Sequence, residues 1–296
     1  MKTGGGASLR GRRFRAVTAV MAVALVSGAC GSGKSPAPEI PPQVSYDPAN
    51  FSHPINIDNQ YYPMVPGTEW VLEGTANRGS GLQPHQVIIT VSDLTKVIHG
   101  IATRVIWEKD VNEGKVAETE LAFFAQDDEG NLWNLGEYPE EYSEKGKFKG
   151  APSTWISGLR GAQGGIHVPG TPSVGSPSYR EGTAPEVDFL DGARVEAMNR
   201  QACGGIGCFA NALVIDEWNS KSNDGHQLKN YVPNIGPLRV DPRGGDEDES
   251  LLLVKLKHLG PADLTKVRDA ARRLDGRGYS YGGKDYRQTP PVEPGV

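Results

Sequence analysis

Apolar and polar residues alternate in many short stretches of this chain, with the two-residue period of β-strands. In residues 102–108, for example, Thr103, Val105 and Trp107 share one face of the expected strand. Clusters of Gly, Asp, Asn and Pro separate the stretches and favour turns between them. The pattern predicts a mainly β protein, an antiparallel meander that forms a sandwich or a half-open or closed barrel. The expected strands span 69–74, 86–91, 102–108, 116–125, 131–136, 194–201, 209–218, 227–232, 238–240 and 250–258.

One segment near the C-terminus changes to a helical period. Leu264, Val267, Ala271 and Leu274 line one side at helical spacing, so the sequence predicts a short helix that begins near Pro261 and ends at Gly276. Residues 277–296 are expected to form a mostly disordered tail. Residues 137–190 hold many Gly, Pro and Ser residues without a clear period, and they could form either a lid or a disordered insert.

The N-terminal residues have the layout of an export signal. Arginines precede the apolar stretch 16–26, which is too short to span a bilayer. Small residues then lead to Cys30, and the segment Ser27–Cys30 resembles the lipobox of bacterial lipoproteins. We expect lipid on Cys30, with plain cleavage and release as the alternative. The predicted organisation is a signal peptide (1–29), a lipid-anchored tether (30–50), a single β-rich domain (51–276) and the tail (277–296).

Charge and cysteine content narrow the function classes. Without residues 1–29 the chain has 26 basic and 36 acidic residues, so it lacks the basic surface that nucleic acids need. Membrane association would therefore depend on the lipid at Cys30. In an oxidising compartment the remaining pair, Cys203 and Cys208, is expected to form a disulfide. A metal site at this pair is disfavoured, because no second ligand pair lies near it in the sequence.

Motifs that could carry catalysis lack the context that they need. Residues 28–35 match a phosphate-binding loop, but the prolines that follow exclude the required helix. Ser280 matches a nucleophile elbow, yet no histidine follows it. The six histidines have no zinc-ligand spacing, and the acidic turns 127–129 and 246–249 lack the pattern of a calcium loop. The sequence therefore predicts no catalytic residue, no cofactor-binding residue and no metal ligand.

Short motifs of one kind occur in the segments Tyr62–Val71, Val97–Val105, Phe124–Asp127, Gly130–Trp133, Asp216–Trp218 and Lys229–Gly236. Together these segments resemble an uncharacterised family of secreted β-rich lipoproteins that is common in actinobacteria and related soil bacteria. The resemblance implies a β-rich fold and an anchored location outside the cytoplasm, and no activity or cofactor. Gln227 stands where the family usually has Glu, and the acidic patch near 184–188 is rearranged.

Two functional hypotheses follow. The first is a non-catalytic cell-envelope lipoprotein that binds an apolar or lipid-like ligand, or acts as a scaffold for an envelope protein. The second is a cell-wall or glycan hydrolase that uses two facing carboxyl groups about 5–10 Å apart. The five tryptophans (70, 107, 133, 155 and 218) are expected mainly in the core, with lining of a ligand pocket as the alternative.

Overall fold

The computed structural model describes residues 39–45, 47–77, 81–220, 225–244 and 248–295, which include neither the predicted signal peptide nor Cys30. These residues form fifteen strands and two α-helices, with short 3-10 turns at Pro48–Asn50 and Pro185–Val187. The strands are β1 Thr68–Asn77, β2 Leu82–Ile98, β3 Ile101–Asn112, β4 Lys115–Gln126, β5 Leu132–Tyr142, β6 Phe148–Gly150, β7 Trp155–Ile156, β8 Gln163–Val168, β9 Tyr179–Ala184, β10 Phe189–Gly204, β11 Gly207–Asn219, β12 His226–Val232, β13 Gly236–Arg243, β14 Ser250–His258 and β15 Glu293–Pro294. The helices are α1 Pro261–Tyr281 and α2 Gly283–Tyr286.

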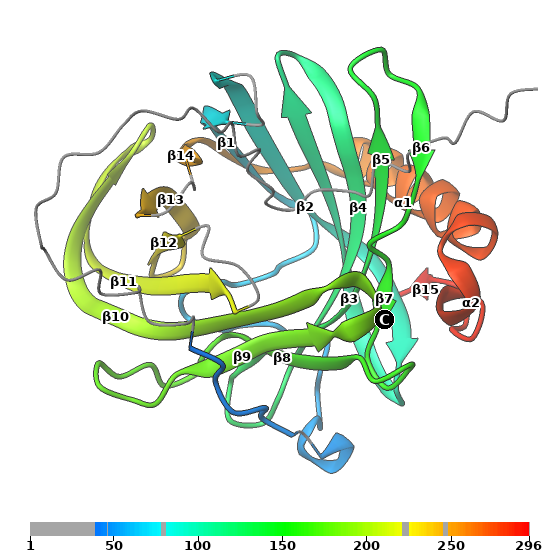
Figure 1. Ribbon diagram of the computed structural model, residues 1–296, viewed down its shortest axis with the longest axis horizontal. Coiled ribbons are helices and arrows are strands. Elements are labelled where there is room, and N and C mark those ends of the chain that lie inside the picture. The colour runs from blue at the N-terminus through cyan, green and yellow to red at the C-terminus, as the bar shows by residue number, and fades with distance from the viewer. Residues whose placement is uncertain (1–38, 46, 78–80, 221–224, 245–247, 296) are drawn as a thin grey trace, which may run out of the picture.

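Twelve of the strands form a closed antiparallel ring (Figure 1). The order is β1-β14-β13-β12-β11-β10-β9-β8-β5-β4-β3-β2, and pairing of β1 with β2 closes the ring. Most ring neighbours are also neighbours along the chain, because short turns of the predicted kind connect them. The mainly β prediction is confirmed, and of the predicted alternatives the chain adopts the barrel.

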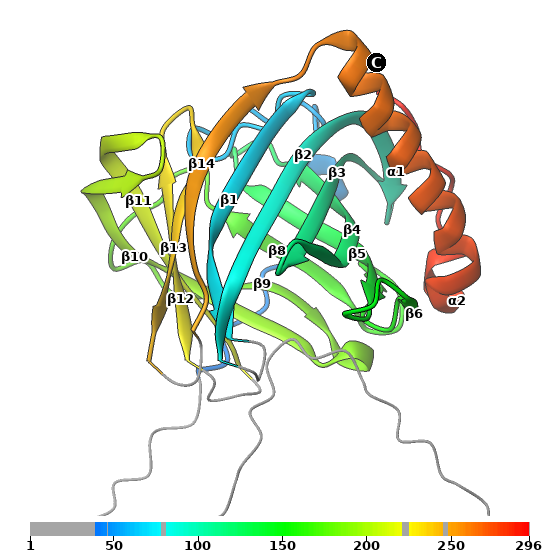
Figure 2. The same ribbon diagram turned by 90° about the horizontal axis from the view of Figure 1, so that it is seen from above.

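Two apolar cores lie on the two faces of the barrel wall. The first fills part of the interior and includes Trp70, Phe124 and Tyr231. The second lies outside, where helix α1 packs against β2, β3 and β4 (Figure 2). A wall with apolar side chains on both faces blurs the alternation of apolar and polar residues, which explains why the expected strand 86–91 is a fragment of the much longer β2.

Helix α1 continues past Gly276, where the sequence predicts its end. The helix extends to Tyr281 because packing outweighs the poor helix propensity of glycine. A Cβ atom on Gly278 would lie 2.2 Å from Cε1 of Tyr286. The glycine therefore lets the ring of Tyr286 pack directly on the helix.

The predicted disordered tail is also wrong. Tyr286 in α2 is fully buried, and β15 pairs with the part of β2 that extends beyond β1. The ammonium group of Lys96 on β2 donates hydrogen bonds to Asp275 Oδ1 and to the carbonyl of Pro290, each at 2.7 Å. Tyr286 donates to the same carboxylate oxygen at 2.7 Å. This polar cluster joins α1 and the tail to the barrel.

Residues 137–190 are neither a separate lid nor an insert, since they form part of the barrel wall. The second half of β5 pairs with the short strands β6 and β7, while β8 and β9 belong to the ring. Prediction failed here because β6 to β9 are only two to six residues long, too short to show a period.

The described part of the expected tether packs against the barrel. The carbonyl of Glu39 accepts hydrogen bonds from the Trp218 indole (2.8 Å) and the Ser220 hydroxyl (2.7 Å). The carbonyl of Pro41 accepts one from Arg180 Nε at 2.6 Å. These contacts show that residues 39–41 are held on the barrel surface rather than free. Within the described ranges, neither helix is long and apolar enough to span a membrane.

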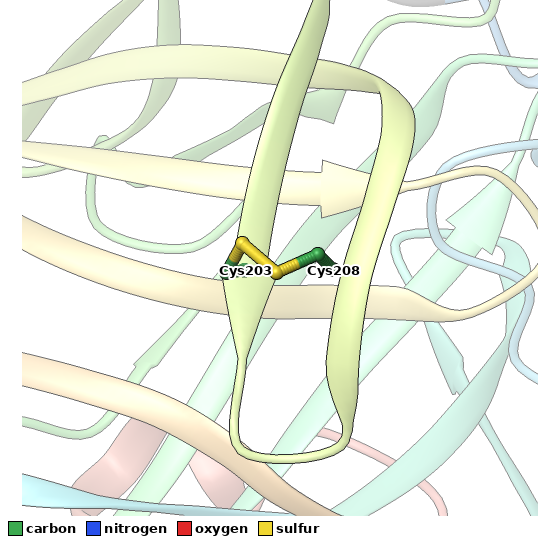
Figure 3. The surroundings of a disulfide bond; sticks show 2 residues. All are labelled: Cys203 and Cys208. Carbon is green, nitrogen blue, oxygen red and sulfur yellow. A yellow bond between two sulfur atoms is a disulfide. The ribbon is translucent and has the colours of Figure 1, made fainter.

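Cys203 and Cys208 are joined by a disulfide bond across the β10–β11 hairpin (Figure 3). The tip of the hairpin folds against β14, where Ile206 N–H donates to the carbonyl of Leu253 at 3.1 Å. The bond thus constrains a turn that also packs on a neighbouring part of the wall.

Removal of this disulfide is expected to lower stability moderately. A loop of six residues restricts the unfolded chain only slightly, which corresponds to about 2 kcal/mol. The double variant C203S/C208S should therefore unfold at a lower urea concentration with unchanged m-value. An unchanged midpoint, with the wild-type disulfide verified by mass spectrometry, would contradict this expectation.

Candidate functional site

The barrel encloses a cavity of about 560 Å³. Part of its lining is apolar and comes from inward-facing residues of β1 to β4, β13 and β14. These residues are Leu72, Ile89, Ile106, Phe124, Val240 and Leu251. The volume and mixed lining are in the range of small-molecule sites in proteins.

Acidic side chains dominate the rest of the lining. Ten Asp and Glu residues face the cavity, against two lysines and one histidine. Strands β3 and β4 contribute four of the acids, and the others come from β5, β9, β10, β11 and the residue before β14. Because β3 and β11 lie on opposite sides of the twelve-strand ring, negative charge surrounds the cavity. The β3 and β4 acids are Glu108, Asp110, Glu118 and Glu120.

The most buried acids are Glu181 on β9 and Glu217 on β11, which we call the inner carboxyl pair. Each residue is 7% exposed, and the two side chains are within hydrogen-bond contact of each other. Burial, with a smaller contribution from nearby carboxylates, raises the pKa of Glu181 to about 8 and that of Glu217 to about 7. A proton shared by the pair is therefore retained at neutral pH.

Two basic side chains border the inner carboxyl pair. Lys229 on β12 forms an ion pair with Oε2 of Glu217. Burial opposes its charge, but Glu217 and Glu181 outweigh that effect and raise the lysine pKa above its ordinary value. His167 Nδ1 lies 3.1 Å from Glu181 Oε1. Burial lowers the pKa of His167 to about 4, so the ring is neutral at neutral pH.

Backbone features bring the inner carboxyl pair together. Ala193 on β10 pairs with Glu217 on one side and with Tyr179 on the other, and its small side chain leaves space between β9 and β11. The pairing of β9 with β10 shifts register between Asp191 and Gly192, so that Glu181 is an extra residue on β9 between the paired Arg180 and Gly182. On the other side of β9, a Cβ on Gly165 would lie 2.2 Å from the carbonyl of Arg180, so only glycine permits this approach of β8.

Aromatic rings form the apolar boundary next to the pair. Tyr62, from the segment before β1, lies between the rings of Trp70 (centroid distance 5.3 Å) and Tyr231 (5.6 Å). Asn59 holds this segment in place: its Oδ1 accepts the backbone N–H of Tyr62 at 3.1 Å, and its Nδ2 donates to the carbonyl of Gly130 at 2.8 Å. The segment before β1 thus inserts into the interior rather than connecting outside it.

The described residues of the nucleophile-elbow and calcium-loop motifs lie in a helix, in a turn and in the cavity wall. Ser280 is exposed on helix α1, away from any strand-to-helix turn. Asp127 accepts hydrogen bonds from the backbone of Asn131 and the indole of Trp133, each at 2.8 Å, and so stabilises the β4–β5 turn. Glu249 lines the cavity. Within the described ranges, no group of three or more His, Cys, Asp or Glu residues is arranged to hold a metal ion.

The tryptophans divide between the two expectations. Trp70, Trp133 and Trp155 are buried, whereas Trp218 is buried and also lines the cavity. The sequence pattern alone did not predict the inner carboxyl pair, although one signal was present. Glu217 has the same parity on its strand as the buried Leu213 and Ile215, which places a carboxyl group among inward positions.

The geometry of the pair bears on the hydrolase hypothesis. Glycoside hydrolases hold their two carboxyl groups about 5–10 Å apart, with the glycosidic bond between them. Glu181 and Glu217 instead contact each other directly and are flanked by Lys229 and His167. The arrangement suits binding and proton exchange better than attack on a sugar.

Comparison with known proteins gives distant structural similarity. No protein-family model matches the chain, and no curated protein matches its sequence. One similar solved structure is a protein from Bacteroides fragilis assigned as exported, with a YmcC-like fold (12% identity, TM-score 0.36). Another is a protein from Parabacteroides distasonis assigned as a lipoprotein (14% identity, TM-score 0.31). Each alignment covers 67% of this chain and 99% of the other. At these scores the fold assignment depends on the strand pairing of the chain itself.

Proposed function

We propose that this protein is a non-catalytic binding protein of the cell envelope that holds a small molecule inside its barrel. One observation carries the proposal: a closed ring of twelve strands surrounds a cavity of about 560 Å³ with both apolar and acidic lining. An interior cavity suits ligand binding better than scaffolding, because a scaffold uses its outer surface. The acidic lining also disfavours fatty acids and other anionic lipids.

The proposed location depends on the N-terminal sequence. Export would follow from the basic and apolar residues before Cys30, and anchoring from lipid on that cysteine. Membership of the actinobacterial lipoprotein family is proposed on the same segments quoted above. Mass spectrometry of the protein isolated from its host tests export and anchoring, since a bare or unprocessed N-terminus would contradict the anchor.

Filling the cavity is expected to weaken ligand binding strongly. Val87 on β2 lines the cavity, and tryptophan at this position occupies space that a ligand needs. The variant V87W should lose at least tenfold in affinity for an environment-sensitive fluorescent ligand, since a blocked pocket forfeits about 1.4 kcal/mol or more of contact energy. Fluorescence titration of the purified protein measures the effect.

Val97 provides a matched control on the same strand. Its side chain is 45% exposed and does not line the cavity. The variant V97W should bind the fluorescent ligand as the wild type does. Equal affinities of V87W, V97W and the wild type would mean that binding takes place elsewhere, and the proposed function would be rejected.

A further inference from the structure

The inner carboxyl pair has hydrogen-bonding capacity that the described residues do not use. Oε1 of Glu181 and Oε1 of Glu217 are buried and accept no hydrogen bond from any described residue. His167 Nδ1 is near the first of these atoms but outside hydrogen-bond geometry. Buried acceptors without donors are rare, because each costs free energy. Both side chains face the cavity, so a ligand could supply the missing donors.

The charge balance identifies the kind of donor. Lys229 pairs with Glu217, and Lys149 is the other lysine of the lining, so two positive charges face ten acids. Lys229 also shows that an alkylammonium group is accommodated beside Glu217. A ligand that brings a second ammonium group would donate to the unused oxygens and reduce the excess of negative charge. The apolar lining around Ile106, Phe124 and Leu251 offers room for the carbon skeleton of such a ligand.

We propose that Glu181 and Glu217 form the binding site for the ammonium group of the ligand, an amphiphilic primary or secondary amine whose apolar part fills the rest of the cavity. This inference depends on the proposed function and specifies its ligand class. In the empty protein the shared proton of the pair takes the place of the cation. Binding of the amine therefore releases that proton, and the affinity depends on pH.

The direction of the pH dependence follows from the surroundings of the pair. Burial raises the pKa of both carboxyl groups, so they lose their proton as pH increases from about 6 to 8.5. An alkylammonium group, with a pKa of about 10, remains charged over this range. Affinity for the amine should therefore increase with pH. The other titratable groups around the pair are Glu137, His167, Asp191, Lys229 and Glu249, together with Tyr62, Tyr179 and Tyr231.

Three dansyl probes of similar size test the proposal. Dansylcadaverine carries an ammonium group, N-pentyl dansylamide is neutral, and dansyl-6-aminohexanoate is an anion. We expect the purified full chain to bind the cation at least tenfold more tightly than the neutral probe at pH 8, and the anion most weakly. Equal affinity for the cationic and neutral probes would overturn this inference while leaving the proposed function intact. Failure of all three probes to bind would overturn the proposed function itself.

Substitution of the pair tests the residues. E217Q and E181Q should each weaken binding of dansylcadaverine by about tenfold or more, because a charge-assisted hydrogen bond is lost, and should leave the neutral probe unaffected. E118Q removes one charge from the β4 side of the cavity and should weaken binding by about threefold or less. E144Q, at an exposed turn, is the outer control. Equal effects of E118Q and E217Q would overturn the assignment to the pair.

Calorimetry of the wild type gives a test that does not depend on how the variants fold. Binding of dansylcadaverine near pH 7 should release up to about one proton, so the apparent enthalpy should differ between two buffers of different ionisation enthalpy. The affinity should also increase between pH 6 and 8.5. A buffer-independent enthalpy together with a constant affinity would overturn the proposal.

Discussion

Replacing Lys96 by methionine is expected to lower the free energy of unfolding by about 3–5 kcal/mol, the usual cost of breaking a buried ion pair from one side. Lys96 is 1% exposed, and its ammonium group is 2.7 Å from Asp275 Oδ1. Without the lysine, the Asp275 carboxylate stays buried and, among the described residues, keeps the hydrogen bonds from Tyr286 and from the backbone of Val292. Urea unfolding followed by tryptophan fluorescence measures the loss.

An exposed lysine on helix α1 provides the control. Lys266 pairs with Asp263 on the surface of α1 at 2.8 Å, and both side chains are largely exposed. The variant K266M should leave the urea midpoint close to that of the wild type, because exposed surface pairs contribute little to stability. A K96M protein as stable as K266M would show that the Lys96 cluster does not hold the C-terminal segment on the barrel.

The second large effect concerns the decrease in stability as pH increases through neutrality. Glu181 keeps its proton in the folded protein up to about pH 8 but loses it near pH 4.5 when unfolded. The folded state therefore binds more protons than the unfolded state between these values, and stability falls as pH increases through this window. For one retained proton the loss is about 1.4 kcal/mol per pH unit, or about 2 kcal/mol between pH 6.5 and 8.

The E181Q variant isolates this contribution. Glutamine does not titrate, so the stability of E181Q relative to the wild type should improve by about 2 kcal/mol from pH 6.5 to 8. His167 acts in the opposite direction up to about pH 7.5, because its folded pKa of about 4 is below the unfolded value of 6.5, but E181Q and the wild type both contain it and its contribution cancels in the comparison. E144Q should show the pH dependence of the wild type. Parallel stability curves for E181Q and the wild type would contradict the assigned protonation of the pair.

The local pattern of apolar and polar residues was sufficient to place several of the long strands of the barrel. Alternation placed strands at 102–108, 116–125 and 209–218, and each lies within an observed strand. A period of two is visible in the sequence where one face of a strand is more exposed to solvent than the other. The same pattern failed at β2, whose two faces contact two different cores, and at β6 to β9, which are too short to show a period.

Features that depend on contacts between distant residues could not be predicted from the local sequence. Helix α1 continues through Gly278 because the ring of Tyr286 packs on that glycine, and the tail is ordered because Lys96, almost two hundred residues before Pro290, donates to its carbonyl. The sequence next to Gly278 or Lys96 contains no local signal for the residue that each of them contacts. The prolines and glycines of the tail predicted disorder for the isolated segment, and only the barrel wall provides the groups that bind it.

Side-chain alternation and turn chemistry act over a few residues, so they were enough to predict a β-rich protein with turn-linked strands. Pairing of β1 with β2 to close the ring, and the contact of Glu181 with Glu217 across Ala193, depend instead on residues far apart in the chain. Contact and burial raise the pKa of these two carboxyl groups, and neither exists until the strands are assembled. The candidate function therefore follows from the closed barrel, since in isolated strands the same acids would be solvated and would have their usual pKa values.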